Sequence, residues 1–288
     1  MTVERWLEVC RAMRDGVAAA VASVPRAHRA DELGRGAGGD LTVAVDRAAE
    51  DAALAVLERL AGDGEGFTVV SEEIGERSYG GGGRWRLVID PVDGSLNAKR
   101  GLPVYAFSVA VADGPSMADV VLGYVYDLGN REEWIARRGA GATVDGVPLG
   151  GSRPLERLQL VALEATRPEH LAPAAEALTG IAERIRVLGS LALALCHLAD
   201  GRVDAVASLR PRGARAVDIA AGQLLVREAG SAVALPDVPG SFGAAPLDLE
   251  GRSRVVAARD DASLAHVAGL LGIGARAGGS SGVACRRE

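Results

Sequence analysis

At residues 90–97 the chain reads DPVDGSLN. The short apolar run at residues 86–89 precedes this stretch, and it is expected to form a strand. Pro91 and Gly94 favour a tight turn, which would direct the carboxylates of Asp90 and Asp93 to the same side. A D-P-x-D-G sequence is also a good surface turn, so its meaning depends on what the rest of the chain places beside it.

A further carboxylate follows another short apolar run. Residues 67–70 are expected to form a strand, and Ser71, Glu72 and Glu73 come directly after it. On its own, Glu72 would be read as a solvated charge. If the two strands are neighbours, however, their ends bring three carboxylates together, and such a cluster requires a positive partner because like charges repel.

The side chains around these positions offer hard oxygen atoms and no nearby histidine or thiolate. Hard oxygen ligands select Mg²⁺, Mn²⁺ or Ca²⁺ over zinc or copper. Asp90 and Asp93 are suitably spaced to share a pair of divalent ions, and two such ions are a recurring device for phosphoryl hydrolysis.

Composition places the chain among ordinary globular proteins. It has 288 residues, of which 48% are hydrophobic and 24% charged, and its net charge is −6. This length predicts one large domain or two closely joined ones. The mild acidity argues against a nucleic-acid partner. The three widely spaced cysteines indicate neither a disulfide framework nor a zinc site, so a reducing cytoplasm is the expected location.

Hydrophobic patterns divide the chain at about residue 152. Residues 1–152 combine an amphipathic first helix, which is favoured over a signal peptide, with a second helix at 46–60 and an antiparallel-looking sheet. This α+β subdomain carries most of the expected metal ligands. Residues 153–272 alternate strands and helices, which predicts layered α/β packing. The Gly-, Ser- and Arg-rich stretch 273–288 is expected to be disordered. No run approaches the ~18 apolar residues of a membrane span.

The strands of the first part are expected at residues 104–111, 120–126 and 133–136, with a hairpin turn at Asp145-Gly146. In the second part, the elements are expected at residues 158–163, 168–178, 184–188, 190–199, 203–208, 218–228, 254–257 and 263–271. Residues 34–40 are expected to be a Gly-rich turn and residues 79–84 a loop.

Two glycine motifs match known patterns but lack the required context. Residues 34–39 fit G-x-G-x-x-G, yet no apolar strand precedes them, which argues against a dinucleotide site. Residues 278–282 fit G-x-S-x-G, but they lie in the expected tail, which argues against a serine hydrolase.

Several stretches together resemble the inositol monophosphatase family, the lithium-sensitive, magnesium-dependent phosphatases. They are residues 71–73 (SEE), 90–97 (DPVDGSLN), 218–222 (DIAAG) and 228–230 (EAG), supported by 39–42 (GDLT), 101–103 (GLP) and 188–190 (LGS). The resemblance covers about residues 30–258. Val217, where the family often has Trp, and the Gly230-Ser231 pair are more similar to the archaeal-type inositol monophosphatase/fructose-1,6-bisphosphatase branch.

The resemblance implies two or three Mg²⁺ ions per site. Glu72, Asp90 and the backbone carbonyl of Val92 would hold the first ion. Asp90, Asp93 and Asp218 would hold the second. Glu72 would also reach a third, weaker ion through waters.

The resemblance also assigns the attacking water. Ser95 stands where the family usually has Thr, and with Asp46 it would orient and deprotonate a metal-activated water for in-line attack. The catalytic group is then Asp46, Ser95 and Glu72. The backbone N–H groups of Gly94 and Ser95 would hold the phosphate, beside Asp93. Asp46 can also be read as a helix N-cap.

Substrate contacts are left with alternatives. Gly189, Ser190 and Leu191 match the family's stretch on the sugar side of the pocket, although Ser190 equally fits the N-cap of the helix that follows. Arg210, Arg212 and Arg215 form either a solvated basic loop or a grip on a second phosphate.

The sequence therefore predicts an α/β enzyme, with an α+β half and an α/β half in a layered αβαβα sandwich. The expected activity is Mg²⁺-dependent hydrolysis of a small sugar or cyclitol phosphate monoester, with inositol 1-phosphate favoured. The alternatives are fructose-1,6-bisphosphatase, histidinol phosphatase, phosphoadenosine phosphate phosphatase, or a weakly active metal-binding partner protein. A homodimer and lithium sensitivity are implied by resemblance, and neither a nucleic acid nor a membrane is expected as partner.

Overall fold

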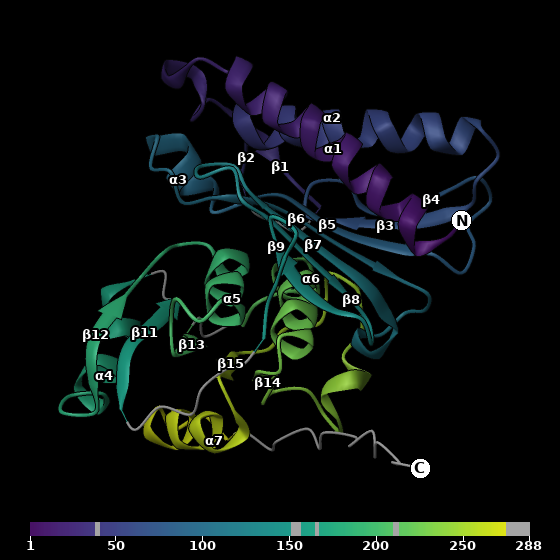
Figure 1. Ribbon diagram of the computed structural model, residues 1–288. Helices are drawn as coiled ribbons and strands as arrows, with labels where there is room; N and C mark the ends of the chain where they lie inside the picture. The colour runs from purple at the N-terminus through teal and green to yellow at the C-terminus, as the bar shows by residue number, and fades with distance from the viewer. Residues whose placement is uncertain (38–40, 151–156, 165–166, 210–212, 275–288) are drawn as a thin grey trace, which may run out of the picture.

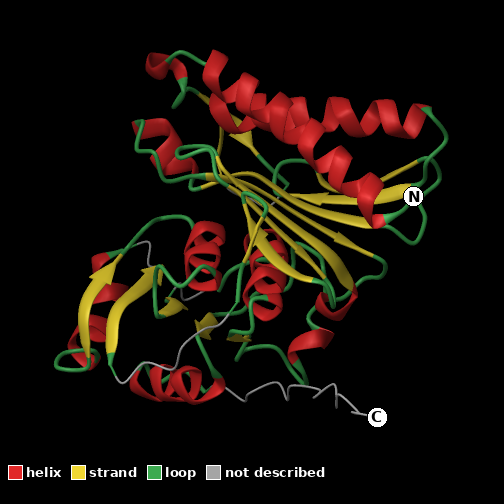
Figure 2. Ribbon diagram, in the orientation of Figure 1, coloured by secondary structure: helices red, strands yellow, loops and turns green. Residues whose placement is uncertain are grey.

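The computed structural model describes residues 1–37, 41–150, 157–164, 167–209 and 213–274. The elements form five layers, helix–sheet–helix–sheet–helix, as Figures 1 and 2 show. This confirms the expected αβαβα sandwich. Three clusters of buried apolar side chains fill the spaces between successive layers.

The large sheet has the strand order β10-β9-β8-β7-β6-β5-β3-β4. Only β3 and β5 run parallel among the paired strands of this sheet that the structure describes. The strands are β3 (Phe67–Ser71), β4 (Gly75–Tyr79), β5 (Arg86–Asp93), β6 (Ala106–Ala112), β7 (Val120–Asp127), β8 (Glu133–Arg137), β9 (Gly141–Val144) and β10 (Val147–Pro148).

Two long helices, α1 (Val3–Ser23) and α2 (Ala44–Gly62), cover one face of this sheet. Their apolar sides are buried because the hydrophobic residues recur at helical spacing, with Trp6, Met13 and Leu57 among the largest fully buried side chains. This agrees with the amphipathic first helix expected from the sequence.

Helices α5 (Leu191–Ala199) and α6 (Ala216–Glu228) form the middle layer between the two sheets. Both are buried on nearly every side, which explains their lack of a polar face. The N-termini of these two helices, together with the end of β5, lie at the candidate site described below.

The small sheet has the order β12-β11-β13-β15-β14 and is covered on its outer face by α4 (Pro168–Ala177) and α7 (Asp261–Leu270). β11 is parallel to β12 and β13, as strand–helix alternation predicts. The strands are β11 (Leu158–Glu164), β12 (Ala182–Arg186), β13 (Ala205–Ser208), β14 (Ala232–Ala234) and β15 (Val255–Ala258).

Several elements differ from the expectation. Strand β1 (Glu32–Arg35) extends into the glycine-rich segment expected as a turn, residues 34–40, and pairs with β2 (Leu41–Val43). The expected loop 79–84 begins only after β4, which is short and mostly exposed, so it lacks an apolar pattern. Four short helices were also not expected: η1 (Arg26–His28), α3 (Ser95–Arg100), η2 (Met117–Asp119) and η3 (Phe242–Ala244).

The division at residue 152 stays a prediction. Ile273, placed in the expected tail, is buried in the core beneath the small sheet, so the packed chain continues beyond residue 272. Residues 275–288 of the expected tail lie outside the described residues. Among the helices that the structure describes, none combines the length and the hydropathy needed to span a membrane.

Candidate active site

Strand β5 places Asp90 and Asp93 through an irregularity in its pairing with β6. Asp90 lies opposite Ser108 and Asp93 opposite Ala106, so β5 contains one residue more than β6 over this interval. This is a β-bulge. Without it, two residues three apart would point to opposite faces of the sheet, whereas the bulge returns Asp93 to the face of Asp90.

Asp90 and Asp93 were expected to follow the strand, and this prediction is wrong. Strand β5 extends to Asp93 because pairing with β6 resumes beyond the bulge. Pro91, which has no N–H to donate, is tolerated because the bulge leaves it outside the ladder. The N–H of Val92 donates to Oδ1 of Asp90 at 3.0 Å, and this bond holds the carboxylate against its own turn.

Asp218 comes from the middle layer. Helix α6 begins at Ala216, two residues before the expected start, so Asp218 lies in the first turn. The extra residues are helical because Ala216 and Val217 are buried among the neighbouring elements. The N–H of Arg215 donates to Oδ2 of Asp218 at 2.7 Å, which caps the helix and fixes this carboxylate.

Asp90, Asp93 and Asp218 meet at one point. Each is buried and offers a carboxylate oxygen, and these oxygens lie within 4.8 Å of one another. Burial, followed by the negative charges of Glu72, Asp93 and Asp218, raises the pKa of Asp90 well above its ordinary value. A divalent cation would relieve this repulsion, and the all-oxygen donor set suits Mg²⁺.

Glu72 follows β3, whose parallel pairing with β5 brings the two strand ends together as expected. Its carboxylate forms an ion pair with the guanidinium of Arg215. The pair joins the residue after β3, a strand of the large sheet, to the N-cap of α6. Arg215, expected as a substrate contact, therefore contacts an expected metal ligand, whereas Arg210 and Arg212 lie outside the described residues.

Asp46 lies in the first turn of α2. The N-cap of this helix is Val43, so the alternative reading of Asp46 as the cap is wrong. Oδ1 of Asp46 is buried and accepts no hydrogen bond within the part of the chain that the structure describes. Burial raises the pKa of Asp46 to about 7, while the positive charge of Lys99 acts in the opposite direction.

Gly94 and Ser95 begin α3, with Gly94 as its N-cap in the left-handed conformation at φ 93°. A Cβ at Gly94 would lie 2.9 Å from the carbonyl oxygen of Val104, so neither the backbone conformation nor the space admits a side chain. Glycine is required here because the chain turns directly from Asp93 into the helix.

Ser190 is the N-cap of α5, which confirms the helix-cap reading. Its Oγ accepts from the N–H of Leu193 at 3.2 Å and donates to Oδ2 of Asp93 at 2.6 Å. The N–H of Ala192 donates to the same oxygen at 2.7 Å. Ser190 thus orients an expected metal ligand, while neighbouring Leu191 is almost fully buried.

Two further residues, which were not predicted from the sequence, hold the backbone just before Ser190. Asn97 donates through Nδ2 to the carbonyl oxygens of Val104 and Leu188, at 2.7 and 2.8 Å. Glu164 accepts from the N–H groups of Leu188 and Gly189. Asn97 belonged to the quoted octapeptide, and Glu164 ends a strand, so both positions carried a signal of the kind used for Asp90.

The sequence profile of the inositol monophosphatase family matches residues 4–271. The chain belongs to the inositol monophosphatase family. The members of this family are phosphoric monoester hydrolases, so the expected enzyme class is confirmed.

Curated relatives agree with membership of the inositol monophosphatase family. The chain is 35% identical over 255 residues to the "Fructose-1,6-bisphosphatase/inositol-1-monophosphatase" of Archaeoglobus fulgidus, covering 88% of this chain and 93% of that protein. It is 34% identical over 207 residues to the "Nus factor SuhB" of Pasteurella multocida, covering 67% and 71% of the two chains.

Solved structures agree as well. An inositol monophosphatase–fructose 1,6-bisphosphatase crystal structure superposes with a TM-score of 0.78 at 26% identity, covering 92% of this chain and 99% of that one. The Thermotoga maritima inositol monophosphatase has a TM-score of 0.74 at 23% identity, covering 94% and 97%. The latter comparison supports the fold.

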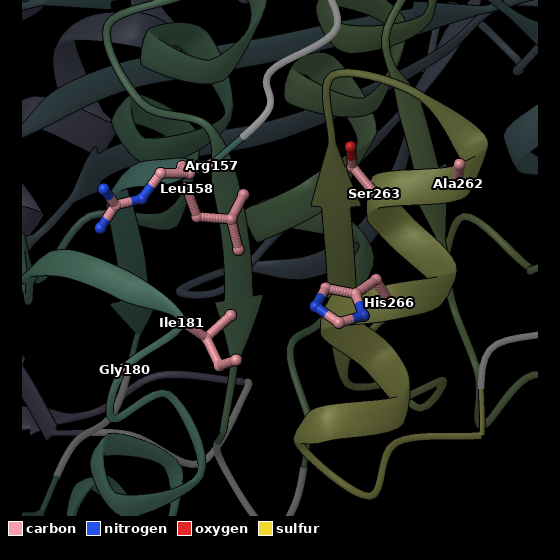
Figure 3. A pocket seen from close by; sticks show the side chains of 7 residues that line it. All are labelled: Arg157, Leu158, Gly180, Ile181, Ala262, Ser263 and His266. Carbon is pink, nitrogen blue, oxygen red and sulfur yellow. The ribbon is translucent and has the colours of Figure 1, made fainter.

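A cavity of about 420 Å³ lies elsewhere in this inositol monophosphatase fold (Figure 3). It is lined by Leu158, at the start of β11, by residues just before β12, and by α7. The expected site residues Gly189 and Ser190 instead follow the opposite ends of these strands. None of the predicted site residues that the structure describes lines this cavity.

Proposed function

We propose that the chain is a Mg²⁺-dependent phosphatase that hydrolyses a small sugar or cyclitol phosphate monoester. One observation carries this proposal. Within a chain of the inositol monophosphatase family, Asp90, Asp93 and Asp218 arrive from two different layers and bring buried carboxylate oxygens within 4.8 Å of one another. Such a cluster is costly unless a cation neutralises it.

The metal ligands in this proposal are those expected from the sequence. Glu72, Asp90 and the carbonyl of Val92 hold one ion, and Asp90, Asp93 and Asp218 hold a second. The buried, unpartnered Oδ1 of Asp46 fits the same scheme, because a buried acceptor of this kind requires a donor. When bound, Mg²⁺ supplies charge neutralisation at the phosphate and acidification of water.

The remaining steps belong to the protein's own side chains. Asp46 and Ser95 orient the attacking water and accept its proton. Burial raises the pKa of Asp46 to about 7, which suits a proton acceptor working near neutral pH. The N–H groups of Gly94 and Ser95, at the sharp turn that only glycine permits, hold the phosphate.

For the substrate we propose inositol 1-phosphate first and fructose 1,6-bisphosphate second. The archaeal relative is named for both activities. Arg215 lies in the site and could contact a second phosphate once a cation takes its place beside Glu72, because a guanidinium suits phosphate. Gly189, which is exposed beside the buried Ser190, borders the same region and would face the sugar.

The decisive experiment is phosphate release from purified protein, with and without Mg²⁺. The substrates are inositol 1-phosphate, fructose 1,6-bisphosphate, histidinol phosphate and phosphoadenosine phosphate. Asp90→Asn should abolish release. The matched control is Asp237→Asn, which removes a surface carboxylate paired with Arg254 and should retain activity. Equal release by wild type and Asp90→Asn would refute the proposal.

A second candidate is a weakly active metal-binding protein that works through a partner. The relative named "Nus factor SuhB" shows that proteins similar to this chain carry names other than phosphatase. A folded protein that binds Mg²⁺ but releases phosphate from none of these esters would favour this candidate.

Three further properties are part of the proposal. Lithium should inhibit phosphate release in the millimolar range, and unchanged activity would contradict this. A homodimer should appear in light scattering. A cytoplasmic location accords with Cys10 and Cys196, which are free and buried.

A further inference from the structure

Glu164 is the last residue of β11 and is only 2% exposed. Its two carboxylate oxygens accept from successive backbone amides, the N–H of Leu188 at 3.1 Å and that of Gly189 at 2.9 Å. A buried carboxylate is costly unless hydrogen bonds replace its water. These charge-assisted bonds therefore hold the segment 188–190 firmly to the end of β11.

The same segment is held from the opposite side. Nδ2 of Asn97, in α3, donates to the carbonyl oxygen of Leu188 at 2.8 Å. Gly189 has φ +79°, and a Cβ there would lie 3.0 Å from the Asn97 side chain. The Leu188–Gly189 backbone is therefore clamped between the end of β11 in the small sheet and α3, the helix between β5 and β6 of the large sheet.

The residue after this clamp contacts Asp93. Ser190 donates to Oδ2 of Asp93 at 2.6 Å, and the N–H of Ala192 donates to the same oxygen at 2.7 Å. Two bonds to one oxygen fix the orientation of the carboxylate. Their donors lie one and three residues beyond Gly189, so a shift of the clamped backbone would move both.

We propose that Glu164 is a positioning residue for the metal site, acting through residues 188–190 and Ser190 on the carboxylate of Asp93. This inference rests on the proposed function, because it takes Asp93 to be a Mg²⁺ ligand. Groups that orient a metal ligand typically change metal affinity by 10–100-fold when substituted. Glu164 is separated from Asp93 by this chain of contacts and has no expected role in the chemistry itself.

The test is Mg²⁺ binding to Glu164→Gln, measured by isothermal titration calorimetry without substrate. Glutamine keeps the shape but replaces one acceptor with an NH₂ group that faces a backbone N–H. We expect Mg²⁺ affinity to fall at least about 10-fold. Phosphate release should then recover towards the wild-type rate as Mg²⁺ is raised, because the chemical groups themselves are intact.

Asp204→Asn is the matched control. Oδ2 of Asp204 likewise accepts from two successive amides, those of Gln159 and Leu160, at 2.7 and 2.8 Å. Asp204 is similarly buried but acts at the start of β11 rather than its end. The Asp204→Asn substitution should lower the melting temperature at least as much as Glu164→Gln does, while leaving the Mg²⁺ affinity unchanged.

Unchanged Mg²⁺ affinity in folded Glu164→Gln, or an equal loss in Asp204→Asn, would overturn the inference. Should Glu164→Gln not fold, Glu164→Asp keeps the charge but withdraws both oxygens by one methylene, and unchanged affinity there would be equally decisive. Wild-type protein that neither binds Mg²⁺ nor releases phosphate would instead refute the proposed function, so the two failures are distinguishable.

Discussion

Replacing Arg215 with Met should make the stability of this protein depend strongly on Mg²⁺. The Arg215 side chain is 7% exposed and that of Glu72 is 23% exposed, so their ion pair is mostly shielded from water. Methionine keeps an apolar stem but removes the charge, and the helix-capping N–H of residue 215 is retained. In metal-free protein, Glu72 would then face Asp90 without the positive charge of Arg215.

The expected magnitude follows from the burial of the pair. Two unit charges 4 Å apart attract by about 4 kcal/mol at an effective dielectric constant near 20. Removing one member of a buried pair costs about 3–5 kcal/mol. Because water reaches part of Glu72, we expect a smaller loss than for a fully buried pair, about 2–3 kcal/mol, in metal-free protein.

Saturating Mg²⁺ should reduce this deficit to below about 1 kcal/mol, because the bound cation would take over the role of the guanidinium. The deficits without and with Mg²⁺ would then differ by about 2 kcal/mol, which corresponds to Mg²⁺ binding that is roughly 30-fold tighter in the variant than in wild type. Urea denaturation with chelator and with Mg²⁺ measures the first quantity, and calorimetry measures the second independently.

The control is Arg254→Met. Arg254 pairs with Asp237 at 2.7 Å, but both side chains are more than a third exposed. Its loss should cost at most about 1 kcal/mol and should not depend on Mg²⁺. A deficit in Arg215→Met that is the same with and without Mg²⁺ would refute the reasoning, because it would show that the cation and Arg215 do not share Glu72.

Three other outcomes are expected. Burial raises the pKa of Asp46 from 3.8 to about 7, so metal-free wild type loses stability as pH rises through this interval. The free energy of unfolding of Asp46→Asn, relative to wild type, should therefore increase between about pH 5 and 7. A difference in urea midpoints that is the same at all these pH values would contradict this. Asp90→Asn should stabilise metal-free protein because it removes one of several repelling charges, and a lower melting temperature with chelator would argue against that repulsion. Gly123→Ala should cost about 1–3 kcal/mol, because its Cβ would lie 2.7 Å from the carbonyl oxygen of Ala221, whereas Gly62→Ala, with open space around it, should be neutral or stabilising in the same urea titration.

The layers of the fold were predictable because apolar periodicity is a local property of the chain. The same reasoning brought the ends of β3 and β5 together, since parallel neighbours end at the same edge. Strands β1 and β4 were missed because they are largely exposed and therefore carry no apolar alternation.

Contacts between distant segments were harder to predict. The pairing of Arg215 with Glu72 and the bonds from Ser190 to Asp93 depend on how the middle helices settle against the large sheet. Each residue type indicated a polar role, but a single sequence does not say which partner lies opposite. Asp46 shows the same limit, because its position at the helix start suggested a cap while its surroundings exclude that role.

The bulge in β5 restricts which lengths of chain this site can tolerate. Since side chains alternate along a strand, a spacing of three keeps both carboxylates on one face only because the bulge absorbs the extra residue; in a regular ladder one of them would point into the apolar layer beneath α2. Removing one residue would abolish the bulge, and with it the turn that lets the N–H of Val92 donate to Asp90. Exchanging the side chains at Pro91 or Val92 disturbs the site far less than changing their number. Related chains are therefore expected to vary in the identity of these two residues, while the spacing of the two aspartates stays at three.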